Sequence, residues 1–142
     1  MNPPIRKELE LNCGIEHAFE TFTRRIDTWW PPSHRFEPGS EVLLEGKVGG
    51  RFLERVGEKE RVHGEVVRWE PPHRLSYTWR PGSDVGPTTV DIEFHELGSD
   101  RTRVEVHHRE GESGLGKDWP ERAKRFDRAW DAVLATFIQH LV

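Results

Sequence analysis

The sequence is poor in cysteine, in net basic charge and in long apolar runs, and each shortage excludes a class of protein. Cys13 is the only cysteine among 142 residues, so no intrachain disulfide can form and paired thiolates cannot build a metal site. No stretch approaches the ~18 apolar residues of a membrane span. The net charge of −4 is opposite in sign to the basic face of nucleic-acid-binding proteins. We therefore expect no membrane span and no nucleic-acid partner.

The N-terminal residues and the chain length set two further expectations. Residues 1–6 lack the apolar segment of a secretory signal, which together with the single cysteine predicts a cytoplasmic location. No internal repeat or linker is visible, and the length suits one compact unit. Residues 1–142 are therefore expected to form a single domain.

Large aromatic side chains supply much of the apolar content of the sequence. Six Trp and seven Phe are present, although charged residues make up 32% of the chain. Disordered segments are poor in aromatic residues. The composition therefore indicates a globular protein whose apolar surface is concentrated in a few large side chains.

The first third of the chain predicts a strand followed by helix. Apolar residues alternate over 5–11, as in a strand, and recur on one helical face over 15–26. Residues 27–30 continue the helical pattern until Pro31-Pro32 stops it. We expect two short helices, or one broken helix, after the first strand.

The middle of the chain predicts antiparallel strands with one wet and one covered face. Gly49-Gly50 is expected to form a hairpin turn between the first two of them. The strands are expected over 41–48, 51–56, 61–69, 75–79, 90–95 and 103–108.

The last segment predicts a long amphipathic helix, with Asp118 as a good N-cap. Its apolar stripe is the only candidate of the right size to cover the sheet. The stripe contains Phe126, Ala129, Trp130, Val133, Leu134, Phe137, Ile138 and Leu141. The sequence thus predicts an α+β helix-grip: a curved antiparallel sheet of about six to seven strands wrapped around the C-terminal helix.

The order of several short motifs resembles one known family. The motifs are Trp29-Trp30, the segment 49–52 (GGRF), the segment 64–66 (GEV), the segment 70–75 (EPPHRL) with Thr78-Trp79, and the segment 102–108 (TRVEVHH). Together they resemble the AHSA1-like branch (activator of Hsp90 ATPase homologue) of the START/SRPBCC superfamily. The resemblance implies a helix-grip, Bet v1-like fold with a cavity between the sheet and the long helix. It also implies that relatives bind hydrophobic small molecules or lipids there, and that a few act on polyketide-like substrates.

Aromatic residues and one histidine are the candidate ligand-binding side chains. Strand alternation and the helix stripe point most of these rings inward, while Trp30 and Phe36 are expected near the cavity entrance. The alternative is that they fill the core and leave no cavity. The candidates are Trp30, Phe36, Tyr77, Trp79, Phe94, His108, Phe126 and Trp130.

His108 shares strand parity with Val104 and Val106, which predicts that it faces inward. A neutral imidazole there could anchor a ligand or act as a general base, or it could be a structural histidine. The other histidines are scattered without ligand spacing, and adjacent His107 and His108 face opposite sides. We expect no metal site and no cofactor.

Three functions follow from these expectations. The leading one is a non-enzymatic protein that binds a hydrophobic small molecule or lipid, with His108 as polar anchor. A second is a co-chaperone-like interaction module or homodimer, which requires an exposed apolar patch around Trp29, Trp30 and Phe36. A third is a cyclase, aromatase or hydrolase that uses His108 as base, which requires a second polar group converging on it.

Overall fold

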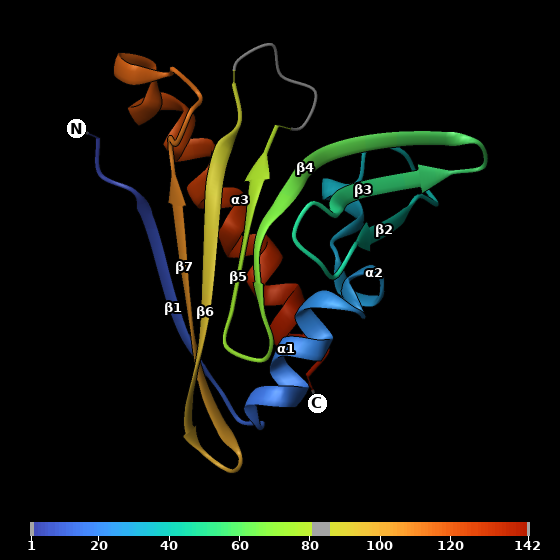
Figure 1. Ribbon diagram of the computed structural model, residues 1–142, viewed down its shortest axis with the longest axis vertical. Helices are drawn as coiled ribbons and strands as arrows, with labels where there is room; N and C mark the ends of the chain where they lie inside the picture. Colours follow the sequence, from blue (N-terminus) through green and yellow to red (C-terminus); the bar gives the residue numbers. More distant parts are fainter. Residues whose placement is uncertain (1, 81–85, 142) are drawn as a thin grey trace.

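A computed structural model describes residues 2–80 and 86–141 and has the predicted helix-grip fold. Within these residues, seven strands form one curled antiparallel sheet in the order β1-β7-β6-β5-β4-β3-β2. Figure 1 shows α3 running along one face of the sheet, with α1 at one end. The elements are β1 (Ile5–Leu11), α1 (Ile15–Thr23), α2 (Ile26–Trp29), η1 (Pro32–His34), β2 (Glu41–Leu44), β3 (Arg51–Val56), β4 (Lys59–Glu70), β5 (Arg74–Trp79), β6 (Thr88–Gly98), β7 (Arg101–Arg109), η2 (Gly116–Asp118) and α3 (Trp119–Gln139).

The two short helices form where the sequence predicts them. Gly14 is the N-cap of α1, and Ala18 and Phe22 bury the apolar face of that helix. The Thr23 hydroxyl donates to the carbonyl of Phe19 at the last turn. Helix α2 ends at Trp29, just before the two prolines that cannot continue it.

The connection between β2 and β3 is longer than predicted. Strand β2 ends at Leu44 rather than at residue 48, so residues 45–50 form the connection. The prediction of a two-residue Gly49-Gly50 turn is therefore wrong. The Glu45 carboxylate accepts hydrogen bonds from the backbone N–H and the guanidinium of Arg51. These bonds close the longer loop, in which Gly49 adopts a φ of +87° that favours glycine.

A β-bulge interrupts the pairing of β3 with β4. Phe52 lies opposite Gly64, and Leu53 lies opposite Val62, which leaves His63 as the extra residue of β4. A bulge bends its strand and changes the direction of nearby side chains. Here it places His63 among buried residues, although its neighbours Val62 and Glu65 are exposed.

Helix α3 covers the concave side of the sheet. It begins at Trp119, whose indole N–H donates to the carbonyl of Pro3, and Asp118 occupies the N-cap position without a side-chain capping bond. Trp130, Val133 and Phe137 of the predicted stripe are buried. Among the described residues, no helix has the length and apolar content needed to cross a membrane.

Candidate ligand cavity

A small cavity lies between the sheet and α3 and is enclosed mainly by aromatic rings. Its volume is about 50 Å³. Strand β5 contributes Tyr77 and Trp79, β7 contributes His108, and the remaining walls come from α3 and the segment after α2. The lining residues are Trp30, His34, Tyr77, Trp79, His108, Phe126, Ala129, Trp130 and Val133. The structure thus brings together most of the residues that the sequence predicted for a ligand site.

Two predicted residues lie outside this cavity. Phe94 is buried, but it packs against Phe19 and Phe22 of α1, at ring-centroid distances of 5.2 and 6.1 Å. It lies four residues along β6 from Val90, the partner of His108, which is about 13 Å at the rise of a strand. The ring of Phe36 instead lies under the guanidinium of Arg61, at 5.1 Å.

Three lining residues were not among the predicted site residues. Ala129 and Val133 belong to the apolar stripe of α3, so the helical periodicity already placed them beside Phe126 and Trp130. His34 lies in η1, a segment with no periodic pattern to orient its side chain. Only the folded chain shows that it closes one side of the cavity.

His108 lies at the centre of a closed hydrogen-bond network. The indole N–H of Trp130 donates to its Nδ1 at 3.0 Å. Because the indole nitrogen is only a donor, the ring proton lies on Nε2, which donates to the Thr88 hydroxyl at 2.7 Å. That hydroxyl donates in turn to the carbonyl of Trp79, at 3.2 Å. Every polar atom of the imidazole therefore has a partner.

This network bears on the predicted roles of His108. Burial lowers its pKa to about 4, so the ring is neutral near pH 7. Its one lone pair is already occupied by Trp130, and neither Trp130 nor Thr88 is a group that relays protons near neutral pH. General-base catalysis at His108 would first have to break the bond to Trp130.

Tyr77 is one polar group of the cavity wall with which a ligand could pair. Its side chain is fully buried, and desolvation raises the pKa of its hydroxyl. Within residues 2–80 and 86–141, no group forms a hydrogen bond with that hydroxyl. Buried hydroxyls in native proteins normally have a partner. A polar group in the cavity would give Tyr77 one.

The cavity is too small, as it stands, for a ring-bearing molecule. A cavity of about 150 Å³ accommodates benzene, and drug-sized ligands occupy about 300–1,000 Å³. A ligand would therefore have to move part of the wall. Phe126 and Trp79 are the half-buried aromatic residues of that wall. The other rings, Trp30, Tyr77 and Trp130, are buried.

In the described part of the chain, the region around Trp29 and Trp30 is not the exposed apolar patch expected of an interaction module. Trp29 and Trp30 are only 1% and 5% exposed, and their rings pack against Phe137 and Phe52 respectively. Among the described residues, the exposed large apolar side chains are Val48, Val62, Val67, Leu97 and Ile138, of which only Val62 and Val67 share an element, β4. The burial of these tryptophans argues against the predicted docking surface.

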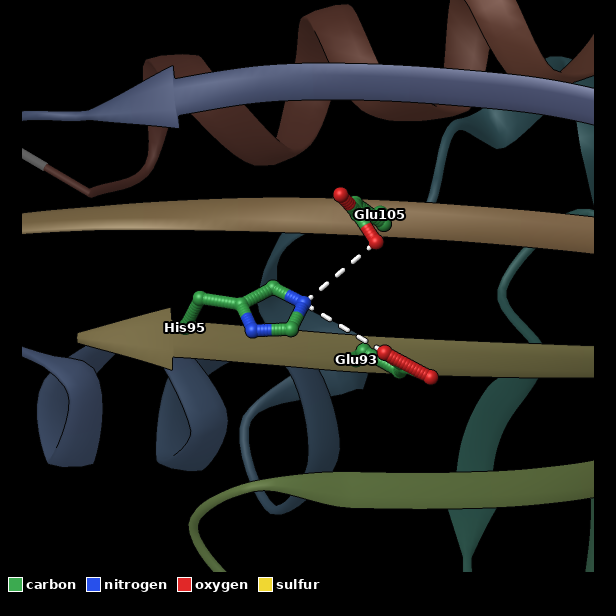
Figure 2. Close-up of side chains that lie close together, drawn as sticks. All are labelled: Glu93, His95 and Glu105. Atoms are coloured by element: carbon green, nitrogen blue, oxygen red, sulfur yellow. Dashed lines mark hydrogen bonds and ion pairs between the residues drawn. The ribbon is translucent and has the colours of Figure 1, made fainter. Parts of the chain in front are cut away.

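A cluster of two carboxylates and one imidazole lies on the opposite face of the sheet (Figure 2). The spacing of residues in the sequence did not group His95 with other potential metal ligands. The pairing of β6 with β7, however, places Glu93 opposite Glu105. The Nε2 atom of His95 lies 3.3 Å from an oxygen of each. Arg103 adds positive charge at 3.4 Å from Glu105. Because these residues alternate with buried ones, the cluster is separated from the cavity by the sheet itself.

Comparisons with known proteins agree with this fold. The family model described as "Activator of Hsp90 ATPase homolog 1-like protein" matches residues 12–142. An anthrahydroquino-gamma-pyrone synthase, solved in complex with SUM, is 30% identical over 99% of this chain and 97% of that chain, with a TM-score of 0.61.

Two more distant structures share the fold. The self-sacrificing resistance protein CalC from Micromonospora echinospora is 23% identical over 98% of this chain and 94% of that chain, with a TM-score of 0.73. An HSP90 activator from Plasmodium falciparum is 21% identical over 82% of this chain and 84% of that chain, with a TM-score of 0.58. No curated protein matches the chain.

Proposed function

The chain belongs to the family of Activator of Hsp90 ATPase homolog 1-like proteins, and on that premise we propose that it binds a hydrophobic small molecule between the sheet and α3. The observation that carries the proposal is the Tyr77 hydroxyl, which belongs to a buried side chain in the wall of an aromatic cavity and forms no hydrogen bond with the described residues. In a filled core, an unpaired hydroxyl would lower the free energy of unfolding by about 1–3 kcal/mol. A ligand with one polar group would remove that cost.

The wall of the cavity favours a flat, ring-bearing ligand over an acyl chain. Five of its lining residues carry Trp, Tyr or Phe rings: Trp30, Tyr77, Trp79, Phe126 and Trp130. Aromatic rings prefer offset or edge-on contacts with other rings, so these walls suit a planar molecule. The name of the 30% identical relative, an anthrahydroquino-gamma-pyrone synthase, supports the same class.

His108 acts in this proposal through Trp130 rather than on the ligand. Its Nδ1 fixes the indole of Trp130, and Thr88 links its Nε2 to the backbone of β5. The network therefore fixes the distance between the Trp130 indole on α3 and the backbone of β5. We infer that it preserves the shape of the cavity wall while the half-buried rings move.

Filling the cavity should abolish binding. Ala129 lines the cavity from α3, so Ala129→Leu places a larger side chain in the space that a ring would take. We expect the Kd for 2-naphthol, measured by calorimetry or by NMR titration of the Trp130 indole N–H, to rise at least about tenfold, which corresponds to 1.4 kcal/mol.

Ala135→Leu is the matched control, because residue 135 is exposed on the same helix and both variants add the same side chain. Its Kd should equal that of the unchanged protein. Equal weakening by both substitutions, or no saturable binding of 2-naphthol and 2-methylnaphthalene by the unchanged protein, would contradict the proposed function.

A further inference from the structure

A carboxylate and an imidazole form a buried pair next to the cavity. Glu54 on β3 is 1% exposed and His63 on β4 is 5% exposed. The Nε2 atom of His63 lies 2.5 Å from Oε2 of Glu54. The other carboxylate oxygen, Oε1, accepts from the backbone N–H of Phe36 at 2.9 Å and from the Ser40 hydroxyl at 2.8 Å. Glu54 is therefore fully paired and fixes the orientation of the imidazole.

Within residues 2–80 and 86–141, the second nitrogen of His63 has no hydrogen-bond partner. Burial lowers the pKa of the ring, against the opposite influence of Glu54, so His63 is neutral near pH 7. Its proton lies on Nε2, facing the carboxylate, which leaves Nδ1 as a hydrogen-bond acceptor. That atom is buried and without any hydrogen bond. Such an orphaned polar atom in a native interior requires an explanation.

The backbone is shaped so that His63 points inward. His63 is the extra residue of the bulge that separates the pairs Phe52–Gly64 and Leu53–Val62. Bulges of this kind occur next to functional sites, where they change the direction of a side chain. Without the bulge, the side chains of β4 would alternate regularly between the two faces of the sheet. The imidazole of His63 would then not point to the buried face.

The indole of Trp79 contacts His63 and also lines the cavity. The ring of Trp79 lies 5.2 Å from the ring of His63, and Trp79 lines the cavity whereas His63 does not. Trp79 is one of the half-buried rings of the wall. Moving this indole would both enlarge a cavity of about 50 Å³ and uncover the imidazole behind it.

We propose that the Glu54–His63 pair is the second polar part of the ligand site, where His63 Nδ1 accepts a hydrogen bond from a hydroxyl on an aromatic ligand once the Trp79 indole moves aside. The inference rests on the proposed function and narrows its ligand class to hydroxylated aromatic molecules. Glu54 is a positioning residue, because it holds the ring without contacting the ligand.

The test compares 2-naphthol with 2-methylnaphthalene, which has a similar shape but no hydroxyl. One good hydrogen bond is worth about 1 kcal/mol, so we expect the unchanged protein to bind 2-naphthol about fivefold more tightly. His63→Phe should remove that preference, so that the Kd values of the variant for the two compounds agree within about twofold. In ¹H–¹⁵N spectra of the histidine side chains, 2-naphthol should shift the Nδ1 signal of His63, and 2-methylnaphthalene should not shift it.

A Tyr77→Phe variant separates this proposal from a bond to the Tyr77 hydroxyl. If that substitution, and not His63→Phe, removes the preference for 2-naphthol, the inference is overturned. Equal affinity for the two compounds with an unmoved His63 signal also overturns it, and leaves the proposed function standing. Binding of neither compound overturns both. Because the Nδ1 signal is measured in the unchanged protein, the test does not depend on the folding of a variant.

Discussion

Glu54→Leu should lower the free energy of unfolding by about 4 kcal/mol. The substitution removes the acceptor of three buried or partly buried donors: the Phe36 N–H, the Ser40 hydroxyl and the His63 imidazole. Each buried donor left without an acceptor costs about 1–3 kcal/mol, because it stays desolvated and unpaired, and the newly buried Leu side chain offsets only part of that cost. Urea unfolding followed by circular dichroism measures the loss.

The matched variant Glu54→Gln has nearly the same shape and keeps one oxygen acceptor for Phe36 and Ser40. Its loss should be smaller, about 1–2 kcal/mol, because only the bond to His63 must be rearranged. Glu54→Leu combined with His63→Phe should recover part of the loss, since both polar partners are then gone. A Glu54→Leu protein as stable as the unchanged one would show that the carboxylate does not support this part of the sheet.

The stability of the protein should fall by about 2 kcal/mol between pH 7 and pH 5 because of His108 alone. In the folded protein, burial lowers the pKa of His108 from 6.5 to about 4. As the pH falls below 6.5, the unfolded chain binds a proton at this residue and the folded chain does not. The stabilising contribution is therefore complete above pH 6.5 and is lost as the pH falls toward 4.

His108→Gln isolates this effect from the other histidines. A glutamine offers an oxygen to the Trp130 indole and an N–H to Thr88, and it does not titrate. Urea unfolding at the two pH values should show a loss about 2 kcal/mol smaller in this variant than in the unchanged protein. If both proteins lose the same stability, His108 is not held neutral by its surroundings.

Strand alternation was sufficient to predict which strand side chains face the cavity. Tyr77 and Trp79 on β5 and His108 on β7 face inward because successive side chains of a strand alternate between its two faces. The 3.6-residue period of α3 did the same for Phe126 and Trp130. Both patterns are local, so no knowledge of the folded chain was needed to orient these side chains.

Alternation could not give the position of a residue along the sheet. Phe94 faces inward as predicted, but the register of β6 sets it beside α1 rather than beside α3. Phe36 lies in a segment between η1 and β2 without periodicity, and its place under Arg61 depends on the β3–β4 hairpin. These two residues lie away from the cavity because register and packing are properties of the whole fold.

The sequence by itself determined the helix-grip, the covered face of the sheet and the rings that face it, because each of these follows from a repeating local pattern. Only the tertiary structure decided that Trp29 is core, that Trp130 and Thr88 occupy both nitrogens of His108, and that the cavity is small. It also decided the pairing of Glu54 with His63, because that contact depends on a one-residue bulge between two strands. A bulge changes which side chains of a strand face inward, and no repeating pattern in the sequence marks its position.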